Sequence, residues 1–203
     1  MEWTVADADL TDKIRRRMKI TKSNRFNYAK RLEKKAASKA LSISLLSVAC
    51  VSASIYLLAF ADSLDVNVSR LIGFLVASAS VYSLILSGQS SATSLARRAN
   101  DAHRCAREIS HLYRKLEVER VDLAETSIRY EKIISSYPEN HDRIDLWKTY
   151  YEESIESKDL VVGPIKGEVP YWFSCHFSLI ATTFFLIVEA LLVCFYTFPS
   201  ASP

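Results

Sequence analysis

Two long apolar runs, Ala40 to Ala61 and Val66 to Ser87, constrain the fold of this chain more than any other feature. Each is about as long as the ~20 residues with which a helix crosses the hydrocarbon core of a bilayer. Arg70 is the one charged residue in either run, and the short loop Asp62 to Asp65 separates them. A soluble helix pair would carry charged residues along its outer face. The two runs therefore predict a transmembrane hairpin.

A third apolar run, Trp172 to Phe198, has aromatic residues near both ends, as membrane-spanning helices often do. The chain has only four Gly and five Pro, which favours long helices over loops. We therefore expect an all-α membrane protein with a transmembrane helical hairpin, long cytoplasmic helices that resemble a coiled coil, and a third, carboxyl-terminal transmembrane helix.

The distribution of charge predicts the topology. Residues 1–39 carry twelve Lys and Arg against five Asp and Glu, and such cationic flanks stay on the cytoplasmic side. Because this segment is polar, we expect no secretory signal peptide. We interpret its cationic side chains as a solvated face with membrane-surface anchors. The predicted order is a basic cytoplasmic segment (1–39), the hairpin (40–87), a cytoplasmic helical region (88–160), a linker (161–171), the third transmembrane helix (172–198) and a short external tail (199–203).

Composition argues against several functional classes. The net charge of +3 is too small to predict direct nucleic-acid binding. The four cysteines, at positions 50, 105, 175 and 194, are too dispersed for a disulfide framework or a zinc site. We expect no cofactor and no metal.

Serines recur at helical spacing in both hairpin runs; those of interest are Ser47, Ser54, Ser80, Ser83 and Ser87. They have two interpretations. Their hydroxyls can bond to the preceding turn and let helices approach closely, or they can wet a central conduit. The second requires a homo-oligomer, because one hairpin cannot enclose a pore.

Glu189 lies well inside the third apolar run. A carboxyl in hydrocarbon is costly unless it is protonated, paired or wetted, so an ionisable group here is a candidate functional residue. It is either a neutral carboxyl bonded to a serine of the hairpin or part of a pore lining.

The region after Gly88 has an apolar heptad pattern that begins at Leu95, Ala102 and Ile109 and continues to Tyr137. It predicts one long cytoplasmic helix with a coiled-coil seam. The seam packs either on another part of the chain or on copies of itself.

Ser136 and Glu139 have the spacing of a capping box, which predicts that a second helix starts there. His141 and Asp145 would share a face of that helix. The segment is interpreted as a turn that docks one helix on another through hydrogen bonds of Asn140 and His141; a metal or acid–base site of His141, Asp142 and Asp145 is the alternative.

Three segments together resemble the SLATT proteins, two-span effectors associated with SMODS nucleotidyltransferases and with SLOG nucleotide sensors. They are Arg25–Leu32, Tyr130–Ile133 and Tyr137–Asp145. The resemblance covers roughly residues 12–160 and is nearest to the subfamily found beside reverse transcriptases. It implies structural or signalling roles for the motif residues Tyr130, Pro138, Asn140, His141 and Asp145.

The resemblance further implies a membrane effector of a bacterial anti-phage or conflict system, without enzymatic activity. A partner would sense infection, and this protein would oligomerise and breach the inner membrane. A reverse transcriptase, a SMODS nucleotidyltransferase and a SLOG-type sensor are the implied partners. The alternative is a non-conducting membrane adaptor that recruits such a partner. The third span departs from the two-span pattern of the family.

Overall fold

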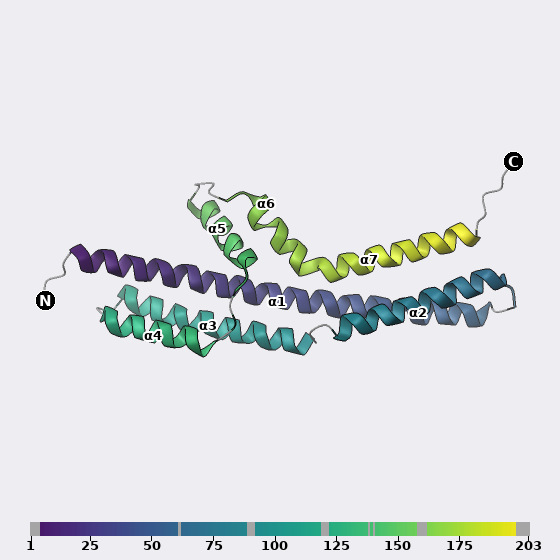
Figure 1. Cartoon of the computed structure of the whole chain (residues 1–203), viewed down its shortest axis with the longest axis horizontal. Coiled ribbons are helices and arrows are strands. Elements are labelled where there is room, and N and C mark those ends of the chain that lie inside the picture. The colour runs from purple at the N-terminus through teal and green to yellow at the C-terminus, as the bar shows by residue number, and fades with distance from the viewer. Residues whose placement is uncertain are drawn as a thin grey trace. The chain divides into compact units, whose positions relative to one another are not determined.

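The computed structural model describes residues 5–60, 62–88, 92–118, 122–137, 139, 141–157 and 162–197. Within these ranges the secondary structure is helical, with no strand. The helices are α1 (Val5–Ala59), α2 (Val66–Gly88), α3 (Ala92–Val118), α4 (Leu123–Ser136), α5 (Arg143–Ser157), α6 (Pro164–Gly167) and α7 (Val169–Thr197) (Figure 1).

The chain divides into two units, which we describe separately. The polar unit comprises Met1–Glu33 and Leu95–Cys175, and the apolar unit comprises Lys34–Ser94 and His176–Pro203. Three helical stretches are long and apolar enough to cross a membrane, and they cover residues 40–59, 66–87 and 172–195 of the three apolar runs. The predicted all-α membrane fold with three spans is confirmed.

In the apolar unit, helices pack through a small buried cluster formed by Leu46, Ala79 and Leu86. The rings of Tyr82 on α2 and Phe185 on α7 lie 5.4 Å apart between centroids. Large apolar side chains elsewhere on these helices are exposed, among them Leu58, Phe74, Leu84, Phe184 and Phe195. Because water would penalise so many exposed apolar groups, this surface suits lipid or other apolar helices.

The polar unit has a core in which the amino-terminal part of α1 packs against α3 and α4 (Figure 1). Its buried members are Met18, Cys105, Ile109, Leu112, Leu116 and Tyr130. The heptad seam therefore packs on another part of the same chain. Of the two alternatives for the seam, this is the one that the structure contains.

The predicted single helix from 88 to 137 is wrong, because α3 and α4 are separate helices. Asp122 has an extended backbone, and its side chain accepts a hydrogen bond from the Ala124 N–H (2.8 Å), which caps α4. Asp122 and Glu125 have the spacing of a capping box within the heptad pattern.

The helix predicted to start at Ser136 begins instead at Arg143. Ser136 is the last residue of α4, and its hydroxyl donates to the Lys132 carbonyl (2.8 Å). Asp142 precedes α5, and its N–H donates to the Asp145 carboxylate (3.0 Å). In a capping box the N3 side chain accepts from the N-cap N–H in this way. Asp142 and Asp145 therefore have the capping-box spacing that was assigned to Ser136 and Glu139, six residues further along the chain.

The predicted linker contains α6 and the start of α7. At Gly167 the backbone of α6 approaches α5 closely. A Cβ at this position would lie 2.4 Å from the Tyr151 Cβ and 3.1 Å from the Trp147 carbonyl oxygen. Only glycine fits without a shift of the backbone.

Replacing Gly167 with alanine should therefore destabilise the polar unit by about 1–3 kcal/mol through overpacking. Gly163→Ala is the matched control, because a Cβ there meets nothing within 4 Å. Gly163 has an extended backbone (φ −74°, ψ 163°) that alanine also adopts, so we expect the control to change stability by less than about 1 kcal/mol. Denaturant unfolding of the detergent-solubilised protein measures both, and equal stability of the two variants would contradict the close approach.

Candidate functional site

The polar unit contains a buried ionic cluster centred on Arg31 of α1. The Arg31 Nε donates to the Asp145 Oδ1 (2.8 Å), and its Nη2 donates to the Asp145 Oδ2 (2.9 Å). The same Nη2 donates to Asp142 (2.5 Å), and Nη1 donates to the Ser174 hydroxyl (3.3 Å). This bidentate pairing matches the planar guanidinium to the carboxylate and fixes its orientation.

Both members of this pair are removed from water. The side-chain exposure is 5% for Arg31 and 0% for Asp145. Burial by itself would lower the pKa of Arg31, but the hydrogen bonds and charge of Asp145, and then those of Asp142, raise it above its ordinary value. A buried charge is tolerated only when paired in this way. The pair therefore holds the start of α5 against α1.

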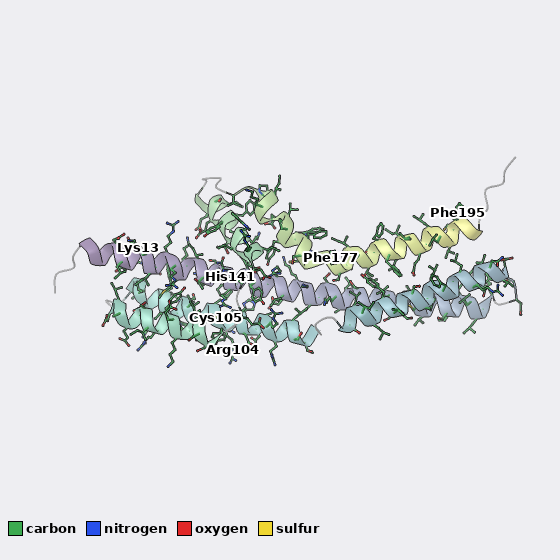
Figure 2. All side chains as sticks on the ribbon, viewed as in Figure 1. Lys13, Arg104, Cys105, His141, Phe177 and Phe195 are labelled. Atoms are coloured by element: carbon green, nitrogen blue, oxygen red, sulfur yellow. The ribbon has the colours of Figure 1, made fainter. Side chains whose placement is uncertain are left out.

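Polar residues about two turns before Arg31 bind the chain just before α5. The Asn24 Nδ2 lies 3.2 Å from the His141 Nε2, and Arg25 donates to the Glu139 carbonyl. Figure 2 shows His141 beside α1. Burial, and then the positive charge of Arg25, lower the pKa of His141. His141 is thus a neutral docking group in the folded protein near neutral pH.

Glu139 links α1 to α3 through its carboxylate. Arg98 of α3 donates to this carboxylate (2.6 Å) and also to the Tyr28 hydroxyl (2.6 Å). The Tyr28 hydroxyl in turn donates to the Glu139 carboxylate (3.1 Å). Burial raises the pKa of Tyr28, so its phenol stays protonated as the donor.

Asn27 extends the same face of α1 towards α5 and α7. Its amide donates to the Thr149 hydroxyl (3.1 Å) and to the Glu152 carboxylate (2.9 Å). Its carbonyl accepts from the Tyr171 hydroxyl (2.9 Å). Further along α4, the Tyr130 hydroxyl lies 2.8 Å from the Thr21 hydroxyl.

Three of the motif residues, Tyr130, His141 and Asp145, contact side chains of α1. Pro138 and Asn140 lie outside the described residues. The interpretation of the basic amino-terminal segment as solvated is wrong for Arg25 and Arg31, which are buried in this cluster.

Sequence reasoning missed Asn24 and Asn27 as docking residues. Together with Tyr28 and Arg31 they are spaced by three and four, so all four lie on one face of a helix. A polar stripe of this kind in an otherwise basic segment was the available signal.

The cluster is better suited to docking than to acid–base chemistry. Asp142 and Asp145 both accept hydrogen bonds from Arg31, so the guanidinium occupies their carboxylate oxygens. Among the residues that the structure describes, no group of three or more His, Cys, Asp or Glu is placed to hold a metal ion.

The candidate serines lie on α1 and α2 in the apolar unit. Ser47, Ser54, Ser80 and Ser87 are exposed, and Ser83 is half-buried. The first three donate to the carbonyl four residues earlier, at 2.8 to 2.9 Å. Ser87 donates to the Leu84 carbonyl (2.9 Å). These bonds satisfy the hydroxyl hydrogen and leave the oxygen able to accept.

Glu189 of α7 lines a cavity of about 190 Å³ in the apolar unit, where small residues of α1 and α2 face it. Ala49, Ala53 and Ala79 are among these residues. Within the described part of the chain, the Glu189 Oε1 is buried and has no hydrogen-bond partner. The structure thus brings Glu189 to the hairpin but shows no bond from this oxygen to a hairpin serine.

A family model described as SMODS and SLOG-associating 2TM effector domain family 5 matches residues 7–198. The chain belongs to this SLATT family. The match extends beyond the 12–160 of the sequence resemblance and includes α7, so the third apolar helix lies inside the SLATT domain and is not an addition to it. Neither curated proteins nor solved structures give a match to the chain.

Replacing Arg31 with methionine should destabilise this SLATT protein by about 3–5 kcal/mol, because Asp145 would be left buried and unpaired. The matched control is Lys13→Met, which breaks an exposed pair with Asp9 (side-chain exposures 71% and 65%). An exposed pair contributes less than about 1 kcal/mol. Denaturant unfolding in detergent measures both variants.

A second change separates the charge effect from a packing effect. Adding Asp145→Leu to Arg31→Met removes the unpaired carboxylate and should recover part of the lost stability. If Arg31→Met were as stable as Lys13→Met, the ionic cluster would not anchor α5.

Proposed function

We propose that this protein is a membrane effector of a bacterial conflict system that assembles in the inner membrane and breaches it when triggered. One observation carries the proposal: helices long enough to span a bilayer expose both apolar side chains and hydroxyls, in a chain that belongs to an effector family. A single hairpin cannot enclose a pore, so the active form is a homo-oligomer.

The basic residues before the first span support a cytoplasmic amino terminus. In this topology residues 88–171 are cytoplasmic and the carboxyl terminus is outside. The polar unit is then the part that meets a partner or a nucleotide signal. A reverse transcriptase, a SMODS nucleotidyltransferase and a SLOG-type sensor are the proposed partners. The protein itself performs no catalysis, since its role is to change the permeability of the bilayer.

Assembly would bring the exposed serines of several copies around a common path. Their oxygens remain free to accept hydrogen bonds from water or to coordinate cations. Glu189 lies beside these helices, and water reaching its cavity would favour the ionised carboxylate. The proposed conduit is therefore lined by hydroxyls with Glu189 as its acidic group.

The proposal is tested by inducing the protein in bacteria together with its neighbouring genes and an infecting phage, while a membrane-potential dye is recorded. Rapid depolarisation in cells that carry the protein supports a breach. An intact potential under conditions that arrest the cells would exclude it. If the potential stayed intact and the purified protein carried a bound reverse transcriptase or nucleotide-sensing partner, the non-conducting adaptor would replace the effector.

Glu189→Gln should alter the rate of depolarisation while membrane insertion stays normal, because the amide keeps the shape but cannot ionise. We expect a change of about tenfold if the carboxylate lines the path, equivalent to ~1.4 kcal/mol. Asp62→Asn, in the exposed loop before α2, is the control for the same chemical change. Identical depolarisation by the two variants would remove Glu189 from the path.

A further inference from the structure

A groove with an apolar floor and a basic rim lies between α3 and α4 in the polar unit. Its volume is about 470 Å³, and Leu112 and Ile133 form its floor. The rim carries three cations, Lys115, Arg129 and Lys132, against the single carboxylate of Glu108.

The charges on the rim differ in how far they are already paired. Arg129 pairs with Glu125 on its own helix (2.6 Å), and Glu108 accepts from the Tyr137 hydroxyl (2.6 Å). Within the described ranges, neither Lys115 nor Lys132 has an ion-pair partner. An apolar floor beneath unpaired cations fits an apolar side chain flanked by carboxylates.

The same chain presents such a side chain on α5. Ile155 is 60% exposed, and Glu152 and Glu156 lie three residues before it and one after it. Residues 152, 155 and 156 share one helix face because they are spaced by three and four. This face combines one exposed apolar group with two acids, of which Glu152 already accepts from Asn27 (2.9 Å) and lies 3.6 Å from Lys148. Glu156 is therefore the acid of this face that is available to a partner.

A similar isoleucine, Ile128 on α4, is 70% exposed, but its neighbouring acids are already held. Glu125 lies 2.6 Å from Arg129, and Glu131 lies 3.1 Å from Arg17. Glu156 lies 3.9 Å from Lys19, at the outer limit of an ion pair, and its side chain is 78% exposed. The Glu156 carboxylate on α5 is therefore more available to a partner than the carboxylates of Glu125 and Glu131 beside Ile128.

We infer that the Ile155 face of α5 docks into the α3–α4 groove of a second copy of the chain. Figure 1 shows α5 on the opposite side of the amino-terminal part of α1 from α3 and α4, so a copy does not fill its own groove. The contact joins two different surfaces, which makes it heterologous and allows a ring of copies.

The inference rests on the proposed function, for which it supplies the assembly step. A contact formed by one helix face in a groove of about 470 Å³ is weak between freely diffusing proteins. Copies held in one bilayer meet at a much higher effective concentration, so several weak contacts suffice for a ring.

Charge reversal in the full-length protein tests the contact. Two copies with different tags are co-expressed, treated in membranes with a carbodiimide that joins amines to carboxylates, and recovered through one tag. Lys132→Glu or Glu156→Lys alone should lower recovery of the second copy about tenfold, because like charges then face each other. Both reversals in one chain should restore it. Lys30→Glu, an exposed cation outside both surfaces, is the control and should leave recovery unchanged.

The apolar part of the contact has its own matched pair. Ile155→Asn should lower recovery, whereas Ile128→Asn should not. Mass spectrometry of the joined peptides should show Lys115 or Lys132 linked to Glu156. Equal effects of the two isoleucine changes, no rescue by the double reversal, or links from these lysines only to another protein would each overturn the inference.

The dye assay separates this contact from the proposed function. Depolarisation that persists in Lys132→Glu, with recovery abolished, would overturn the contact as the assembly step and leave the membrane breach standing. Cross-linked copies that never depolarise the membrane would support the contact and overturn the breach.

Discussion

The buried pair of Arg31 and Asp145 is the interaction on which the polar unit depends. A guanidinium out of water needs a carboxylate in a defined geometry, and this carboxylate also caps the start of α5. Asp145 therefore fixes two things at once: where α5 begins and which face of α1 it meets. The bonds from Asn24, Arg25 and Asn27 lie along the same face and follow from that alignment.

The membrane-spanning part of this SLATT protein could be predicted from the sequence because hydropathy is a local property. An apolar run about as long as a bilayer is thick has few other folds, whatever lies elsewhere in the chain. The heptad pattern from Leu95 to Ile109 likewise indicated correctly which face of α3 is buried. It did not indicate the partner, since one apolar face packs equally well on another copy or on α1.

The helix boundaries and the ionic cluster were not predictable in the same way. Ser136 with Glu139 and Asp142 with Asp145 have the same capping spacing, and only the tertiary pairing of Asp145 with Arg31 selects the second. Arg31 and Asp145 lie 114 residues apart in the chain. Nothing in the basic segment distinguishes Arg31 from a solvated cation except its place in the polar stripe that begins at Asn24.

The charges of the polar unit consequently fall into two groups with different effects. Those on the inner face of α1 are buried and paired, so altering them changes the stability of the fold. Those on the rim of the α3–α4 groove are exposed, so altering them leaves the core of Met18 and Ile109 intact. The net charge of +3 does not reveal these two groups, because a buried, paired residue and an exposed, unpaired one contribute equally to it. In the assembly proposed above, a copy can therefore stay folded while it is apart from the others and associate with them without rearranging this core.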